Sequence, residues 1–139
     1  MPMARDHAAS GVIDGKLYVI GGREKHPSNP LNVNEEYEPT KDEWVTKAPM
    51  PTSRGGIVAT LSDSIYVFCG ETDTRIFANT EEYVPSLDTW IVREEMPSAR
   101  HGCAAAEVDG GIYVISGSTV PGVVAFSPST KNEVFTPVN

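Results

Sequence analysis

The chain has 139 residues, which suits one domain and leaves little room for two. Its composition of 40% apolar and 22% charged residues supplies a buried core and excludes an intrinsically disordered chain. The net charge of −8 would repel the phosphate backbone of a nucleic acid and an anionic membrane surface, so neither is expected as a partner.

The 12 glycines and 11 prolines interrupt the chain too often for long helices and predict an all-β fold of short strands. No segment reaches the roughly 18 consecutive apolar residues of a membrane helix, and residues 1–7 lack the apolar core of a signal peptide. Cys69 and Cys103 lie in apolar, strand-like runs and are expected to be buried free thiols. These features favour a reducing, cytoplasmic location.

One pattern recurs three times with a period of about 47 residues, which is the length typical of propeller repeats. Each copy opens on a short segment that ends in an arginine, namely Arg5, Arg54 or Arg100. A strand around Tyr18, Tyr66 or Tyr113 follows, and these tyrosines lie 48 and 47 residues apart. The chain is therefore expected to consist of three similar units.

Each copy predicts four short strands. The first covers residues 8–13, 56–61 and 103–108, and its small and β-branched residues suit a crowded central position. A tight turn follows at residues 14–15, 62–63 and 109–110, where Asp-Gly is a strong hairpin signal. The second strand then ends on a pair of small residues at 21–22, 69–70 and 116–117.

The third strand carries Tyr37 or Tyr83, and the fourth begins seven residues later at Trp44 or Trp90. The third copy departs from this pattern. Phe126, within residues 125–128, takes the place of the tyrosine, and Glu133 takes the place of the tryptophan. Its last strand is expected over residues 134–138.

This order of motifs resembles the kelch repeat of β-propellers: Met-Pro-x-x-Arg, Ile-Tyr-Val closing on Gly-Gly, Glu-Tyr-x-Pro and Trp. The resemblance covers the whole chain and implies three four-stranded antiparallel blades at residues 2–48, 49–95 and 96–139. It also implies a set of structural anchors in which glycines allow close packing and aromatic residues pack between blades: Gly21, Gly22, Gly70, Gly117, Tyr37, Tyr83, Trp44 and Trp90.

Three blades do not close a ring, because closed propellers have about four to eight. An open arc would expose an apolar sheet face at each end, which soluble monomers avoid. Two explanations compete. Two copies related by a twofold axis can close a six-bladed ring, or the chain is a fragment of a longer kelch protein. Met1 falls at a motif boundary and the last predicted strand reaches the end of the sequence, which fits either explanation. The dimer is slightly preferred, because the chain begins with its own Met.

In an antiparallel meander the arginine segments and the loops after the glycines lie on one rim. These loops, at residues 23–32, 71–79 and 118–122, vary in length and composition, as binding loops do. The resemblance to kelch substrate adaptors allows the repeat arginines to contact an acidic peptide. Alternatively, each pairs with an acid such as Glu36 or Glu82 and holds adjacent blades together. The rim candidates for partner binding are Arg5, Arg54, Arg100, His7, His101, Arg23 and Arg75.

No catalytic, metal-binding or phosphate-binding motif is present. His7 and His101 follow their repeat arginines by two residues and one residue, so they are expected on different faces and not in a metal site. His26 lies in a proline-rich loop and is expected in solvent. The resulting prediction is a non-enzymatic module without cofactor that binds a protein or peptide and forms a homodimer. The alternative is a carbohydrate-active or small-molecule enzyme of the mutarotase or oxidase type.

Overall fold

The computed structural model describes residues 1–61, 63–122 and 127–137, with the backbone alone for residues 57–61. Strands are its regular elements apart from one 3₁₀ turn, η1 (Pro85–Leu87). The predicted all-β fold is therefore confirmed for the described residues. None of their helical turns is long and apolar enough to cross a membrane.

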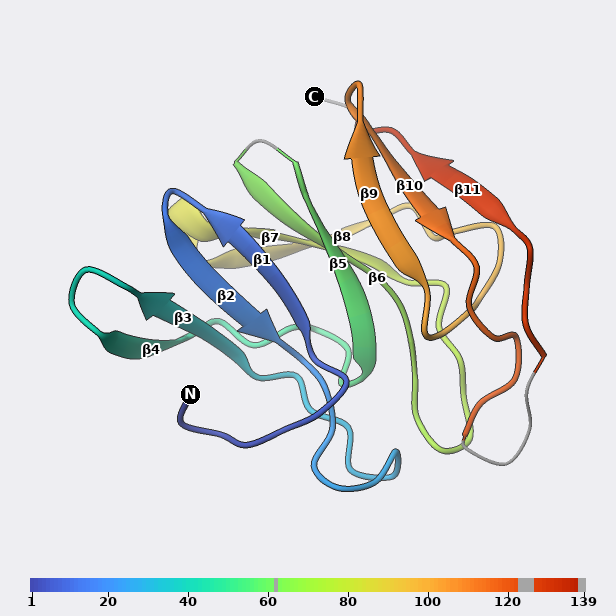
Figure 1. Ribbon diagram of the computed structural model, residues 1–139, viewed down its shortest axis with the longest axis horizontal. Helices are drawn as coiled ribbons and strands as arrows, with labels where there is room; N and C mark the ends of the chain where they lie inside the picture. The colour runs from blue at the N-terminus through green and yellow to red at the C-terminus, as the bar shows by residue number, and fades with distance from the viewer. Residues whose placement is uncertain (62, 123–126, 138–139) are drawn as a thin grey trace.

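The strands form three separate antiparallel sheets that follow one another along the chain (Figure 1). The first sheet has the order β1-β2-β3-β4 and the second β5-β6-β7-β8, whereas the third has the order β11-β10-β9. Their bounds are β1 (Ala9–Ile13), β2 (Lys16–Ile20), β3 (Asn34–Glu38), β4 (Glu43–Lys47), β5 (Gly55–Leu61), β6 (Ser64–Glu71), β7 (Thr80–Val84), β8 (Thr89–Arg93), β9 (Ala104–Val108), β10 (Gly111–Ile115) and β11 (Asn132–Phe135).

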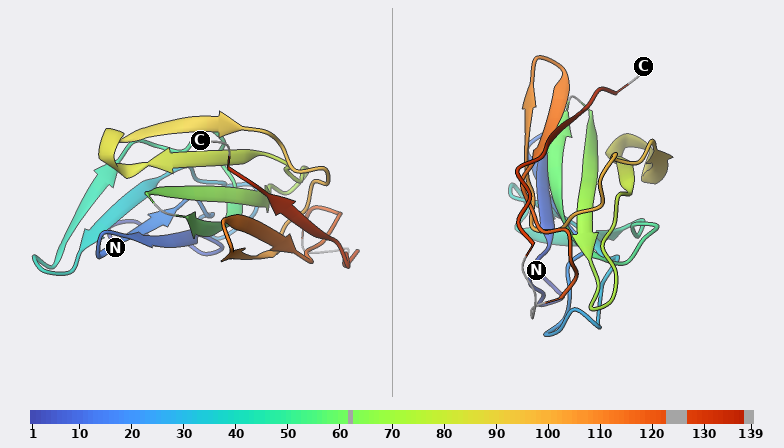
Figure 2. Two further views of the ribbon diagram at one scale, coloured as in Figure 1. Left: turned by 90° about the horizontal axis from the view of Figure 1, so that it is seen from above. Right: turned by 90° about the vertical axis from the view of Figure 1, so that its right-hand side faces the viewer.

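The sheets lie side by side like part of a fan, with the first strands β1, β5 and β9 next to one another (Figures 1 and 2). This is the predicted central position of the first strands. The hairpins that leave them are tight, because Asp14 and Gly15, like Asp109 and Gly110, adopt the positive φ of a two-residue turn. The corresponding turn at residues 62–63 includes a residue outside the described part of the chain.

The pairing of β11 shifts the alignment of the third repeat. Val134 lies opposite Tyr113 and Phe135 lies opposite Ile112. In the first two sheets these positions belong to Glu36 and Tyr37 and to Glu82 and Tyr83. Phe135 therefore takes the tyrosine position that the sequence analysis gave to Phe126, which lies outside the described residues.

The prediction of a fourth strand from residue 134 is wrong, because residues 134–135 belong to the third strand of the sheet. The cause is the loop after β10, which continues to residue 131 and so displaces the motif by nine residues. No described residue forms a fourth strand in the third sheet.

Apolar side chains fill the two seams between neighbouring sheets. Successive residues of β6 point to opposite faces, so Ile65 and Val67 face the first sheet while Tyr66 and Phe68 face the third. We call the face with Ile65 and Val67 the leading face and the opposite one the trailing face. Each seam packs the trailing face of one sheet on the leading face of the next. The leading face of the first sheet and the trailing face of the third are left as end faces.

Candidate functional site

The arginine segments and the loops after the second strands meet on one rim of the molecule, as the sequence predicted. Isolated bridges join Asp6 to Arg23 and His101 to Ser118, and so tie the first and third arginine segments to the loops of their own sheets. In the second sheet the pairing of Gly55 with Glu71 has the same effect. A further bridge joins Phe77 to Arg100 across the second seam. We call this edge of the molecule the loop rim.

The three repeat arginines are buried beneath the loop rim, since the side chains of Arg5, Arg54 and Arg100 have no exposed area. The Arg54 guanidinium donates to the Glu81 carboxylate at 2.6 Å and its Nε donates to the Cys69 carbonyl at 2.7 Å. Arg5 and Arg100 make the same kind of contacts, to Glu35 at 2.8 Å and to Glu133 at 3.0 Å. Each guanidinium thus joins the second strand of its own sheet to the third.

The acids that pair with the arginines lie one residue before those named from the sequence. Strand alternation turns Glu81 toward the leading face, whereas Glu36 and Glu82 point to the trailing face. There Glu36 accepts hydrogen bonds from the Tyr18 hydroxyl at 2.8 Å and from Lys16 Nζ at 2.9 Å. The arginine ion pairs therefore lie within one sheet and do not bridge adjacent ones.

Burial has opposite effects on the charged groups of these clusters. It lowers the pKa of the Arg54 guanidinium, and the neighbouring Glu81 carboxylate opposes that change. Burial alone would raise the pKa of Glu36, but hydrogen bonds from Lys16 and Tyr18 bring the pKa below its ordinary value. Burial, followed by the nearby charge of Glu82, raises the pKa of the Tyr66 hydroxyl to about 12. The lowered pKa of Glu36 favours its carboxylate form, and the Glu81 carboxylate favours the charged form of the Arg54 guanidinium.

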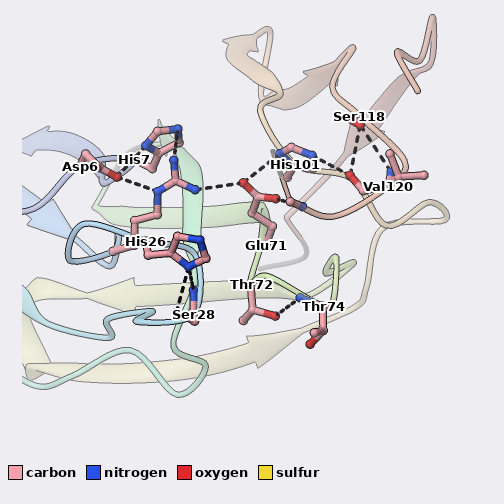
Figure 3. A network of polar contacts seen from close by, with 12 residues as sticks. Asp6, His7, His26, Ser28, Glu71, Thr72, Thr74, His101, Ser118 and Val120 are labelled. Atoms are coloured by element: carbon pink, nitrogen blue, oxygen red, sulfur yellow. Dashed lines mark hydrogen bonds and ion pairs between the residues drawn. The ribbon is translucent and has the colours of Figure 1, made fainter. Parts of the chain in front are cut away.

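A network of polar side chains crosses the loop rim between the first and third sheets (Figure 3). Arg23 Nε donates to Asp6 at 2.7 Å, and an Arg23 Nη lies 3.0 Å from His7 Nε2. The other Arg23 Nη lies 3.4 Å from the buried Glu71 carboxylate, which in turn lies 3.4 Å from His101 Nδ1. Hydrogen bonds to Arg23 and then to His7 hold the pKa of Asp6 below its ordinary value.

The sequence analysis did not single out Glu71, although it is the centre of this network. It also accepts a hydrogen bond from the Gly122 backbone N–H at 2.8 Å. A sequence signal existed, because Glu71 and Arg23 both directly follow the pair of small residues that ends a second strand. Opposite charges at equivalent positions of neighbouring repeats indicate a pair across the seam.

Two hollows open beside this network and share His101 and Gly102. The first has a volume of about 90 Å³ and is lined by His7, Arg23, Gly55, Gly56 and Glu71 in addition to the shared pair. The second has a volume of about 400 Å³ and continues along Gly117, Ser118 and Pro128. Together they form a groove across the starts of the three innermost strands, which we call the rim groove. Its glycines leave backbone accessible to a ligand.

Of the remaining residues singled out from the sequence, His7 and His101 line this groove. Arg75 is exposed, with its guanidinium 4.9 Å from the centre of the Phe77 ring. His7 is exposed and His101 is partly buried, with Nε2 2.9 Å from the Val120 carbonyl oxygen. His26 is exposed in its loop and contacts Ser28. No group of three or more His, Cys, Asp or Glu side chains within the described residues is placed to hold a metal ion.

Most of the glycine and aromatic anchors make close contacts within their own sheets. A Cβ on Gly22 would lie 2.6 Å from the Asp6 carbonyl oxygen, and φ is positive at Gly22, so no other residue fits without strain. Tyr83 packs on Trp90 with ring centres 5.1 Å apart, and Tyr37 packs on Trp44 at 4.9 Å. These contacts connect the third strand of a sheet to its fourth.

The expectation of free thiols is wrong, because Cys69 and Cys103 form a disulfide. Cys69 lies in β6 of the second sheet and Cys103 directly precedes β9 of the third, so the bond crosses the second seam. The residues are 34 positions apart in sequence, and only the packing of adjacent sheets brings their Cα atoms to 6.8 Å. Because Cys69 and Cys103 are not free thiols, they do not support the expected reducing compartment.

Comparison with known proteins agrees with this architecture. Residues 4–51 match the family model of the kelch motif. The first repeat therefore carries a kelch motif. A Kelch-like protein of Aspergillus terreus is 38% identical over 77 residues, which cover 54% of this chain and 17% of that protein.

Two further relatives match parts of the chain. A putative F-box/kelch-repeat protein of Arabidopsis thaliana is 40% identical over 63 residues, or 43% of this chain and 25% of its relative. Beta-scruin of Limulus polyphemus is 37% identical over 76 residues, or 54% of this chain and 8% of that protein. The chain thus spans a quarter or less of each of these three relatives.

Proposed function

We propose that the chain is a protein-binding module that captures a protein or peptide in the rim groove. Kelch repeats are generally protein-interaction modules, and the names of the relatives point to such proteins. The observation that carries the proposal is the position of the groove, which crosses both seams and is surrounded by loops that differ between repeats. A partner would contact Arg75 and His7 at the exposed margins, because the repeat arginines are buried.

Charge reversal on the loop rim tests this function. We expect the double variant Lys25→Glu and Arg75→Glu to weaken capture of a partner by about tenfold or more, since both side chains are exposed beside the loops. The matched control is Lys41→Glu, in the turn at the opposite ends of the strands. Equal capture by both variants, measured by quantitative pull-down, would contradict a rim-binding role.

We further propose that a second copy of the chain closes the ring at the two end faces. The leading end face exposes part of Leu17, Val19 and Tyr37, whereas the equivalent Ile65, Val67 and Tyr83 are buried in the first seam. The trailing end face exposes the apolar side chains Val108, Ile115 and Val134. In both internal seams a trailing face packs on a leading face. The trailing end face of one copy can therefore cover the leading end face of the other in the same way.

The backbone supports the same pairing. In both seams a glycine N–H at the end of the second strand of one sheet donates to the backbone carbonyl of the repeat arginine of the next sheet. Gly22 donates to Arg54 at 3.0 Å and Gly70 donates to Arg100 at 2.9 Å. At the ends of the arc, the equivalent groups are the Gly117 N–H and the Arg5 carbonyl. Neither has a backbone partner of this kind among the described residues. A second copy would bring them together.

The number of blades supports two copies. Two chains of three sheets give six blades, within the range of about four to eight for closed propellers, whereas three chains exceed it. Light scattering is the first test, with a particle of twice the 15.0 kDa chain as the expected mass.

The disulfide provides a template for a sharper test. Ser116 directly precedes Gly117 as Cys69 directly precedes Gly70, and Ala8 precedes β1 as Cys103 precedes β9. We expect Ala8→Cys mixed with Ser116→Cys to form a covalent dimer under oxidation, while either variant alone forms little. A monomeric particle, or a dimer that this pair fails to cross-link, would contradict the proposed ring.

A further inference from the structure

The disulfide between Cys69 and Cys103 lies next to the rim groove. Cys103 directly follows Gly102, which lines both hollows of the groove. Cys69 directly precedes Gly70, whose N–H donates to the Arg100 carbonyl across the second seam at 2.9 Å. The bond therefore belongs both to the seam and to the wall of the groove.

The two sulfurs of this disulfide have different surroundings. Cys69 is fully buried in the apolar cluster of the second seam, with its Sγ 4.0 Å from Met96 Sδ. Cys103 belongs to the same cluster but keeps 8% of its surface exposed. A Cβ on Gly117, which lines the wider hollow, would lie 2.8 Å from Cys103 Sγ. Because Gly117 has no side chain, it leaves this sulfur uncovered at that point of the hollow.

The wider hollow is large enough to admit a small thiol. Its volume of about 400 Å³ falls within the range of about 300–1,000 Å³ that is usual for small-molecule sites. Its lining among the described residues is His101, Gly102, Ser116, Gly117, Ser118 and Pro128. No carboxylate belongs to this set, so an acidic thiol such as glutathione meets no like charge in the lining, despite the negative charge of the chain.

We propose that Cys103 is the site at which a low-molecular-weight thiol opens this disulfide. A thiolate in the wider hollow attacks Cys103 Sγ and forms a new S–S bond to it while the bond to Cys69 breaks. The electron pair of the broken bond leaves with the Cys69 sulfur, which takes up the proton that the incoming thiol lost. The incoming sulfur is oxidised and Cys69 is reduced. The product is a mixed disulfide on Cys103 and a free thiol on Cys69.

Access decides which of the two sulfurs is attacked, because the rate of exchange depends on the approach of the thiolate to the sulfur. Cys69 offers no exposed surface for such an approach, whereas Cys103 has the hollow beside it. The adduct occupies the wider hollow, and the covalent link across the second seam is lost. The contacts between β5 and β9 still hold the two sheets together. The modification thus fills part of the rim groove without separating the sheets.

The natural disulfide gives the most direct test. The oxidised chain is treated with a limiting amount of reduced glutathione at a dilution where light scattering gives the mass of one chain. The reaction is quenched over time, free thiols are alkylated, and peptides are mapped by mass spectrometry. We expect glutathione on Cys103 with the alkyl group on Cys69, in about tenfold or greater excess over the reverse arrangement. Equal amounts of the two adducts, an excess on Cys69, or no adduct at any time would overturn the proposal.

Two single-cysteine variants compare the sites without the disulfide. Cys69→Ser leaves only Cys103, and Cys103→Ser leaves only Cys69, so both variants lose the same covalent bond. With oxidised glutathione as the probe, Cys103 should form its adduct at least about tenfold faster than Cys69. Melting curves verify that both variants are folded. Equal rates would mean that the hollow gives Cys103 no advantage and would contradict the proposal.

A substitution in the lining tests the route of entry. Ser116→Tyr places a bulky side chain at the wider hollow and should slow the reaction of the natural disulfide about fivefold or more. Thr119→Tyr is the matched control, since Thr119 is exposed in the same loop but lies outside the lining. Equal rates in the two variants would exclude entry through the hollow. These readouts need no binding partner and are taken on the single chain, so they are independent of the proposed capture and of the proposed ring.

Discussion

The leading faces of the first and second sheets carry almost the same residues in different surroundings. On the second sheet Ile65, Val67 and Tyr83 are at most 1% exposed, because the first sheet covers them. On the first sheet Leu17, Val19 and Tyr37 occupy the same positions and are partly exposed. The residue pattern of a blade thus defines a surface that requires a cover, and the position of the blade in the arc decides whether the cover is present.

Removal of the repeat arginines should give the largest difference in unfolding free energy between the two leading faces. We expect Arg54→Ala to cost about 3–5 kcal/mol of unfolding free energy, because it leaves Glu81 charged and buried. Arg5→Ala should cost about 1–2 kcal/mol, since water can reach Glu35 from the open end once the guanidinium is removed. Urea denaturation of both variants measures the gap. Equal losses of unfolding free energy would mean that the covering sheet does not change the contribution of the arginine–glutamate ion pair to stability.

Truncation of matched aliphatic residues should give the next largest effect. Ile65→Ala removes a fully buried side chain from the first seam and should cost about 3 kcal/mol. Leu17→Ala at the end face should cost about 1 kcal/mol at low protein concentration. If a second copy covers the end face, the cost of Leu17→Ala should grow with protein concentration while that of Ile65→Ala changes less. Thermal melts across a dilution series distinguish the two behaviours.

The disulfide allows a comparison of the two seams. Replacing Cys69 and Cys103 together by serine should cost about 2 kcal/mol, the lower end of the usual range, because β5 and β9 also hold the sheets together. Hydrogen exchange should report the loss mainly in β9, β10 and β11. A loss shared equally by the first sheet would indicate that the three sheets unfold as one unit.

The smallest effect concerns acid pH. The Ala48 backbone N–H, followed by the Tyr83 hydroxyl, holds the pKa of Asp88 below its ordinary value of 3.8. A folded-state pKa below the unfolded one stabilises the fold above about pH 4, and this stabilisation is lost as the pH falls through the lowered pKa. Asp88→Asn should therefore make stability slightly less dependent on pH below 4 in acid titrations followed by circular dichroism.

Asp42→Asn is the matched control for the hydrogen bonds of Asp88. Asp42 accepts from the Tyr37 hydroxyl at 2.8 Å as Asp88 accepts from Tyr83, but no neighbouring sheet provides an N–H to it among the described residues. At pH 7 its replacement should cost less unfolding free energy than Asp88→Asn. A larger cost for Asp42→Asn than for Asp88→Asn would contradict the role assigned to the backbone donor of the seam.

The sequence predicted the parts of the fold that depend on local pattern. The Asp-Gly hairpins, the central first strands and the common rim follow from turn chemistry and antiparallel order. The third repeat was misaligned because Phe126 is followed by Ser127 and Pro128, which imitates the Tyr-x-Pro order of the other repeats. The better signal was Glu133, which precedes Phe135 by two residues as Glu81 precedes Tyr83.

The candidate site was less accessible from sequence because it depends on contacts between sheets. The positions of His7 and His101 on the loop rim could be predicted, but the expectation that they point to different faces is wrong, because both line the same hollow. Their connection through Glu71 could not be predicted, because it needs the separation of adjacent sheets. The disulfide was missed for the same reason. Cys69 and Cys103 occupy different positions within their repeats, so only the offset between neighbouring sheets places them together.

The disulfide across the second seam also determines how the chain would respond to tension. A force applied at the two ends of the chain extends the residues before Cys69 and after Cys103. The segment between the two cysteines, which are 34 positions apart, bears no load because the disulfide transmits the force across it. The extended length is thereby shorter by about 115 Å, at roughly 3.4 Å for each residue. β7 and β8 lie within that bypassed segment, so a pull would strip the first sheet and leave these two strands free of load.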